Sequence, residues 1–312
     1  MRSWTSKYIL LALIAIVSVW RITSGEWDIP FNDVVRFLIH GGSEAEAIVI
    51  RSVRLPRLLA SLGTGGLLSV SGVILQGLLA NPLAEPYTLG IASGAAFGAS
   101  IGIISGMFIM PCAFAGALSA LILTFIISFN GGHEKIILAG VISNAFLSAG
   151  VTFIKAIAGD RLSAIVLWLM GSFSGSGMND ALYVWLGVVI VLLPAYIFSP
   201  ALDAMSLGSD YANVLGVNEK FLRAFMLVIM SMGVALSVSS FGVIGFVGLV
   251  VPHISRGLVG ASHRRLIVHA FMTGALLMCL ADGAAQMMNE LPTGVITAIT
   301  GGPFFCYVLA KK

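Results

Sequence analysis

The chain has 312 residues, of which 58% are hydrophobic and only 10% are charged, and its formal net charge is +3. Together with a mean hydropathy of +1.01, this composition excludes a soluble globular domain. A membrane-spanning helix needs about 20 mostly apolar residues, so the length allows at most about ten or twelve spans in a single domain over 1–312. We therefore expect an all-α polytopic membrane protein, with any energy-converting domain on another chain.

The first 24 residues carry Arg2 and Lys7 and then an apolar run, as a secretory signal peptide does. No small-x-small cleavage site follows them, so we expect an uncleaved first span. Residues 25–53 are the only long polar stretch before the end of the chain. We expect this stretch to form a periplasmic or extracellular loop.

Ten apolar segments are predicted to span the membrane. The nine that follow the first lie at about 58–79, 87–106, 108–128, 136–157, 181–200, 222–240, 243–258, 266–286 and 292–309. An even number places both termini on one side. That side would carry ten of the 17 basic residues and a net charge of +5, against −2 opposite. The positive-inside tendency therefore predicts cytoplasmic termini and a multi-pass protein of the cytoplasmic (inner) membrane.

Three arginines, Arg51, Arg54 and Arg57, form a basic cluster on the otherwise acidic outer face of this topology. Beyond the span that they introduce, glycines recur at every fourth position from Gly90 to Gly106. Glycine weakens a helix in water by about 1 kcal/mol relative to alanine, but small residues at this spacing let helices in a bilayer approach closely. The glycine stripe therefore predicts close helix packing.

The segment NPLAEP, Asn81 to Pro86, follows the inner end of the second predicted span. Its two prolines cannot continue a helix, and Pro86 suits the first position of the next one. Non-helical backbone at membrane depth is tolerated only against protein or a water-filled cavity. Two interpretations stay open, a gate or pore lining and a tight cytoplasmic turn.

The longest predicted inner loop is 201–221. Ser206 is expected to cap a short helix, Gly216 to end it after Leu215, and Asn218 to cap the next span. The pattern predicts a short amphipathic helix, a glycine hinge and a new helix on the cytoplasmic side. Such a loop is either an ordinary surface connector or a docking element for a partner.

Residue patterns for catalysis or metal binding do not occur in the sequence. There is no GxxxxGK[ST] loop to cradle phosphates and no HExxH, and the cysteines and histidines are scattered singly. We predict no catalytic residue, no cofactor and no metal site, and expect no enzyme activity. Ionisable residues sit near the ends of the predicted spans, Asp282 being the deepest, which argues against coupling to an ion gradient.

Six motifs, in order from about residue 50 to the C-terminus, resemble the FecCD-type permeases, the membrane subunits of bacterial ATP-binding cassette (ABC) importers for ferric siderophores, haem and cobalamin. The motifs are RLPR at 54–57, SGVILQGLLANPLAEPYTLGIASGAAFGA at 71–99, LAGV at 138–141, LGVN at 215–218, GFVGLVVPHISRGLVGASHRRL at 245–266 and ELPTGVITAITGGPFF at 290–305. The resemblance implies the ten-span cobalamin/siderophore permease fold. It also implies pairing with a second permease, a homodimer being favoured, two cytoplasmic ATPase subunits and an extracytoplasmic substrate-binding protein. Lipid surrounds such a subunit, and no nucleic acid is expected as a partner.

The resemblance also assigns roles to individual residues. It implies that Arg54 and Arg57 dock the binding protein and that Asn81 and Leu83 form the cytoplasmic gate. It also implies that Asn144 lines the translocation path. The coupling element for the ATPase comprises six residues: Ser206, Leu207, Leu215, Gly216, Val217 and Asn218. One departure concerns an arginine that some members carry shortly after the acid matching Asp282, where this chain has Gly283 or Gln286. The stretch from Asp282 to Glu290 is also shorter than usual, so the outer docking surface or the partner is expected to differ.

The expected cargo of such a permease is a metal chelate, with ferric siderophore as the default. Haem or cobalamin, carried by the same mechanism, are the alternatives, and molybdate or tungstate is ranked below them. Two alternatives belong to other functional classes. The interrupted helices also suit an ion-gradient-driven secondary transporter. A membrane-embedded structural or receptor protein is the second alternative, but it would leave the polar loop 201–221 unexplained.

Overall fold

The computed structural model describes residues 2–25, 27–40, 45–128 and 132–310, and its regular secondary structure within those ranges is helical throughout. Parts of the predicted outer loop, residues 26 and 41–44, lie outside the described residues. The elements, with the π-helix η1 and the 3₁₀ helices η2 and η3, are α1 (Arg2–Thr23), α2 (Phe31–His40), α3 (Ala45–Val49), η1 (Ile50–Arg54), α4 (Leu55–Leu78), η2 (Pro86–Leu89), α5 (Ile91–Ser105), α6 (Ile109–Ser128), α7 (His133–Ile157), η3 (Gly159–Arg161), α8 (Leu162–Leu169), α9 (Met178–Ile197), α10 (Ser199–Ser206), α11 (Ser209–Val214), α12 (Glu219–Phe241), α13 (Val247–Val259), α14 (His263–Met287) and α15 (Thr293–Ala310).

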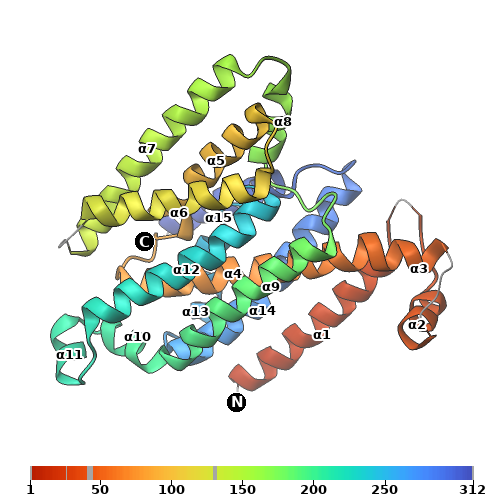
Figure 1. Cartoon of the computed structure of the whole chain (residues 1–312). Coiled ribbons are helices and arrows are strands. Elements are labelled where there is room, and N and C mark those ends of the chain that lie inside the picture. Colours follow the sequence, from red (N-terminus) through yellow and green to blue (C-terminus); the bar gives the residue numbers. More distant parts are fainter. Residues whose placement is uncertain (1, 26, 41–44, 129–131, 311–312) are drawn as a thin grey trace.

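Helix α4 lies at the centre of the bundle (Figure 1), and by solvent exposure nearly all of its residues are buried. It packs against α14, α9 and α13, and its glycines set the closest approaches. A Cβ atom at Gly65 would lie 2.1 Å from the carbonyl oxygen of Gly274, and one at Gly72 would lie 1.9 Å from that of Gly248. Because no side chain fits at these crossings, α4 meets its neighbours backbone to backbone, as small residues permit within membranes.

The glycine stripe packs α5 against α6, as predicted. A Cβ at Gly94 would lie 2.4 Å from the carbonyl oxygen of Gly116, and one at Gly98 would lie 2.1 Å from that of Cys112. Helices α5 to α8 form one side of the bundle, and α7 lies along its edge (Figure 1). The α2–α3 segment and the α10–α11 segment lie at opposite ends of the molecule (Figure 1).

The prediction of about ten transmembrane helices is not confirmed by the helix count. Seven described helical segments are long and apolar enough to cross a membrane, and the described chain contains further, shorter helices. Two of the apolar helices, α5 and α13, have only 15 and 13 residues. A full crossing takes about 20 residues, so these two are short of it.

Both short helices begin part-way along the bundle. The chain returns from the end of α4 along that helix, so that Pro86 lies against Gly248, next to the carbonyl of Leu68 near the middle of α4. There the Tyr87 hydroxyl donates to the carbonyl oxygen of Ile244 at 3.1 Å. The last residue of the NPLAEP segment thus contacts the start of α13, and Tyr87, which follows it, contacts the non-helical stretch before α13. Pro86 does open the next helix, η2, as expected.

Candidate functional site

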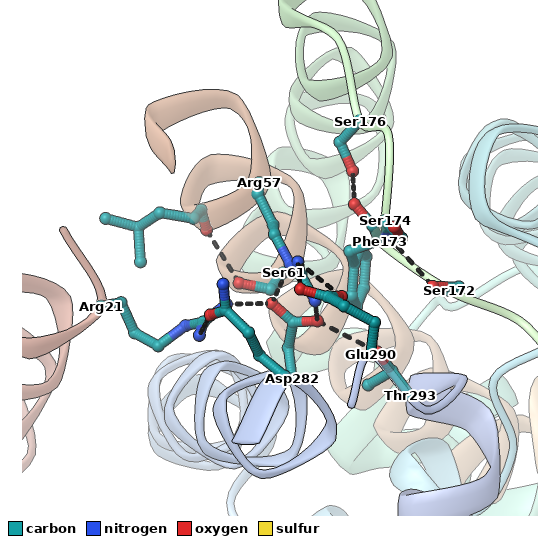
Figure 2. A network of polar contacts seen from close by, with 12 residues as sticks. Arg21, Arg57, Ser61, Ser172, Phe173, Ser174, Ser176, Asp282, Glu290 and Thr293 are labelled. Carbon is teal, nitrogen blue, oxygen red and sulfur yellow. Dashed lines mark hydrogen bonds and ion pairs between the residues drawn. The ribbon is translucent and has the colours of Figure 1, made fainter. Parts of the chain in front are cut away.

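Four charged side chains meet near the start of α4, and we call them the arginine–carboxylate cluster: Arg21, Arg57, Asp282 and Glu290. The Arg57 guanidinium makes two 2.9 Å hydrogen bonds to the Asp282 carboxylate, from Nε and from Nη2, and a third at 2.9 Å from Nη1 to Glu290. Arg21 reaches the same carboxylate from α1 (Figure 2). It also donates to Gln286. The cluster thus joins α1, α4, α14 and the turn before α15.

Burial makes the pairing within this cluster obligatory. Arg57 is 8% exposed and Asp282 is fully buried. A buried charge is tolerated only when it is paired and its remaining hydrogen-bonding capacity is satisfied. The two arginines balance the two carboxylates, and the Thr293 hydroxyl donates a further bond of 3.1 Å to Asp282.

Local structure explains how the cluster forms. Pro56 lies at the start of α4, directly after the π-helix η1, and Arg57 follows it on the buried face. Glu290 lies in the turn between α14 and α15, where Asn289 and Glu290 have φ angles of 58° and 59°. Left-handed backbone is uncommon for residues other than glycine. The turn therefore holds the Glu290 carboxylate against Arg57 by an unusual conformation.

The predicted docking residues Arg54 and Arg57 are both engaged within the chain. Arg54 donates from Nη1 to the carbonyl oxygens of Ile22 at 2.6 Å and Thr23 at 2.8 Å, and it also donates to the carbonyl of Trp27. It therefore fixes the segment that follows α1. Their role in docking a partner stays a prediction.

A cavity of about 580 Å³ opens beside the cluster. Arg54, Arg57, Gln286 and Glu290 line one part of it, and the loop 173–177 lines another. Polar and charged groups from separate segments of the chain thus face the same space beside the cluster.

Sequence reasoning missed Arg21. Gln286, one of the two positions where an arginine was expected and absent, accepts a hydrogen bond from Arg21 instead. The available signal was an arginine at the end of the first apolar run together with Asp282, the deepest predicted acid. Two opposite charges near the ends of different spans are candidates for pairing, but their separation of 261 positions hides which residues pair.

At the opposite end of the molecule, the predicted coupling loop forms α10 and α11. Ser206 ends α10, and its hydroxyl donates to the Asp203 carbonyl oxygen at 2.7 Å. The expectation that Ser206 caps the following helix is therefore wrong, because Gly208 precedes α11. Asn218 caps α12 as predicted, its side chain accepting from the Phe221 N–H at 3.1 Å.

Gly216 ends α11 as predicted. Its φ is 77°, its N–H donates to the carbonyl oxygen of Asn213 at 3.0 Å, and the Val217 N–H donates to that of Ala212 at 3.0 Å. These two bonds form the Schellman arrangement, in which a left-handed glycine satisfies the last helical carbonyls. Next to this well-defined stop, the apolar residues Leu207, Val214 and Leu215 are exposed.

Asp203 connects this loop to α14. Its carboxylate accepts from the His263 backbone N–H at 2.8 Å and lies 2.7 Å from Nδ1 of the same residue. His263 is the first residue of α14, so a side chain of α10 satisfies one of its free N–H groups. The coupling loop is thus held directly to the helix that carries Asp282 at its other end.

The residues predicted for the gate and the translocation path do not belong to the arginine–carboxylate cluster. They lie on other segments of the chain. The Asn81 side chain accepts from the Leu83 N–H at 2.9 Å in the segment after α4, and Leu83 is half exposed. Asn144 is exposed on α7, and its backbone nitrogen lies near Gly90. Within the described ranges, no group of three or more His, Cys, Asp or Glu side chains is placed to hold a metal ion.

The fold and composition define a helical integral membrane protein. The FecCD transport family matches residues 10–311, and the chain belongs to this family. A permease assigned to iron chelatin transport in Helicobacter pylori is 34% identical over 310 residues, covering 97% of this chain and 95% of the relative. The molybdate import permease of Haemophilus influenzae is 36% identical over 273 residues, covering 84% and 81%. Other relatives are named as cobalamin and hemin permeases.

A solved structure is similar over the whole chain. It belongs to an ABC transporter assigned to the metal-chelate type, in an inward-facing conformation, and it is 32% identical to this chain. The TM-score is 0.89, and the likeness covers 98% of each chain. The chain is therefore similar in sequence to permeases named for several cargoes, and in fold to a transporter of the metal-chelate type.

Proposed function

We propose that this chain is the membrane permease of an ATP-driven importer for a metal chelate, with a ferric siderophore as its cargo. The observation that carries the proposal is the likeness along nearly the full chain to a permease assigned to iron chelatin transport and to the solved metal-chelate type transporter. ATP hydrolysis belongs to a separate ATPase subunit in this proposal, and the chain itself is not an enzyme.

The proposed topology has ten membrane segments and cytoplasmic termini. Seven are the long apolar spans, α5 and α13 are the two short ones, and α15 completes the ten. The charge balance of the loops supports cytoplasmic termini. In this orientation the arginine–carboxylate cluster lies at the outer end, and α10 and α11 lie at the cytoplasmic end.

The α10–α11 segment is the proposed contact with the ATPase. Exposed apolar residues, Leu207, Val214 and Leu215, flank a rigid helix stop at Gly216, and Asn218 begins the next helix. Exposed apolar side chains beside a fixed turn are suited to insertion into a groove of a partner. Through Asp203, motion of this segment would be passed to the start of α14.

The proposed path for the cargo runs where the short helices begin. Non-helical backbone inside a membrane protein is tolerated where it lines a cavity or contacts protein, and transporters use such breaks at their substrate sites. Asn81 and Leu83 would gate the cytoplasmic side of this path, and Asn144 on α7 would line it, between two permease copies in a homodimer. Arg54 and Arg57 would receive the substrate-binding protein at the outer end.

Reconstituted transport tests the proposal. The permease is placed in liposomes with its ATPase, the cognate binding protein is added outside, and uptake of the labelled chelate is measured. Uptake is expected only with ATP and the ATPase; vesicles that lack the ATPase are the control. Uptake driven by a proton or sodium gradient without ATP would overturn the mechanism in favour of a secondary transporter.

The cargo is tested separately from the mechanism. The cognate binding protein is purified from cells, and its retained ligand is identified by mass spectrometry and absorption spectroscopy. A ferric siderophore is the expected result. Retained haem, cobalamin or molybdate would reject the cargo and leave the ATP-driven mechanism standing.

A further inference from the structure

We infer that Glu290 is an internal substitute for a partner's carboxylate: it occupies Arg57 in the free permease and is displaced when the substrate-binding protein docks an acidic side chain there. The inference rests on the proposed function, since it requires a binding protein at this end of the molecule. It adds that docking is an exchange of one carboxylate for another at a buried arginine.

The two carboxylates that hold Arg57 are not equivalent. Asp282 is fully buried and accepts from both arginines and from Thr293. The Glu290 side chain is 33% exposed and is held by Arg57 through Nη1. Charge-assisted bonds inside a protein are strong when they are numerous and buried. Glu290 is therefore the carboxylate that can leave, and Asp282 is the one that keeps both arginines in place.

Charge balance explains why an acidic partner would be accepted. With Glu290 in place, two arginines face two carboxylates. Without it, Arg21 and Arg57 face Asp282 alone, and one positive charge is uncompensated beside a cavity of about 580 Å³ that Arg54 also lines. A carboxylate entering this cavity restores neutrality. A neutral or basic side chain does not, so the site selects an acidic one.

The turn that carries Glu290 is built to release it. Asn289 and Glu290 both have left-handed backbone, a strained conformation for residues with a Cβ that persists only where surrounding contacts enforce it. One of those contacts is the bond to Arg57. Because Thr293 at the start of α15 bonds to Asp282, the turn lies directly between the exchangeable bond and a membrane helix. Release of Glu290 would free the turn at the base of α15.

The exchange predicts that Glu290 competes with the binding protein. Apparent affinity falls in proportion to the fraction of permease in which the binding group is free. Glu290→Gln removes the competing charge and keeps the shape of the side chain. We expect it to bind the binding protein about tenfold more tightly at low ionic strength, with the gain shrinking as salt screens the charges.

The experiment measures association of the binding protein with full-length permease in nanodiscs, at several NaCl concentrations. Asp160→Asn is the matched control, because Asp160 is an exposed acid near the end of α7 and its loss changes the net charge by the same amount. Asp160→Asn is expected to leave the affinity within about twofold of the native value. In an Arg57→Gln background, Glu290→Gln is expected to give no gain, because the competition acts through Arg57.

The outcomes separate this inference from the proposed function. If native permease fails to bind the binding protein at any ionic strength, the proposed function fails and the inference with it. If native permease binds, but Glu290→Gln binds equally or more weakly, or gains as much with Arg57→Gln, the inference alone is overturned. If Glu290→Gln is not recovered folded, Glu290→Asp replaces it: its shorter side chain withdraws the carboxylate, and an affinity no tighter than native rejects the exchange.

Discussion

The two ends of α14 are held in different ways. At one end Asp282 lies in a buried cluster with two arginines, a second carboxylate and a hydroxyl. At the other end His263 is held by Asp203, whose side chain is 38% exposed. His263 and Asp282 are 19 positions apart on α14, so at 1.5 Å per residue the two contacts lie about 29 Å apart along the helix.

The difference concerns how costly it is to break each contact. Removal of the fully buried member of the cluster, Asp282, would strand the charges that it pairs in apolar surroundings. A carboxylate near the surface exchanges a hydrogen bond to protein for one to water at little cost. The cluster therefore suits a permanent anchor with one exchangeable member. The Asp203–His263 contact is buried on the histidine side only, and water can reach its carboxylate.

The largest effect is expected for Asp282→Asn. The amide leaves Arg21 and Arg57 with a single carboxylate between them, and stranding a buried charge costs about 3–5 kcal/mol. The purified protein should unfold at a clearly lower temperature, measured by the Tm in detergent, or fail to accumulate in the membrane. Asp160→Asn is the control. A Tm equal to the native value would show that the cluster is not the anchor of this end.

A smaller loss is expected for Arg21→Gln. Asp282 keeps both bonds to Arg57, so the variant loses the charge-assisted bonds made by Arg21, worth about 2 kcal/mol. Chemical denaturation in mild detergent measures the change against the native protein. A loss as large as that of Asp282→Asn would mean that Arg57 alone cannot satisfy the buried carboxylate.

Asp203→Ala tests the other end of α14. Its stability cost should be about 1 kcal/mol, the usual value for removing a side chain that caps a helix N-terminus. Its main effect should be on coupling, with uptake per ATP hydrolysed falling several-fold in proteoliposomes while binding-protein association is unchanged. Asp160→Ala is the matched control, because it removes the same charge from an exposed position away from this contact. If Asp203→Ala takes up as much chelate per ATP hydrolysed as the native protein, the Asp203–His263 contact does not transmit movement to α14.

The smallest change in stability is expected for Val214→Ser. Val214 is 86% exposed, and exposed substitutions generally stay within about 0.5 kcal/mol. The variant should nevertheless weaken association with the ATPase, measured by co-purification and by stimulated ATP hydrolysis, because an apolar contact is lost. Undiminished association would argue that the exposed apolar face of α11 is not the docking surface.

The sequence predicted features that depend on neighbouring residues. Gly216 and Asn218 stop and start helices through hydrogen bonds made within a few positions, and both predictions are confirmed. Ser206 was misassigned because a serine serves equally well at the end of a helix, bonding back to Asp203. Local signals of this kind do not reveal on which side of a serine the helix lies.

The sequence could not predict features formed by distant residues. The contact of Pro86, shortly before α5, with Gly248 at the start of α13 joins two segments that are far apart in the sequence. The partners of Arg57 are likewise invisible along the chain, although the arginine itself was singled out. It was expected to face a partner protein, yet in the folded chain it lies buried between Asp282 and Glu290.

Composition alone indicates that the chain is a membrane protein, because 58% apolar residues and 10% charged residues cannot form a soluble surface. Glycine spacing dictates where helices approach closely, because a missing side chain is a local property. Which charges pair, and which carboxylate stays exchangeable, is decided by the tertiary structure. Burial and charge balance belong to sets of residues that only folding brings together, and Arg21, separated from Asp282 by 261 positions, is the clearest example.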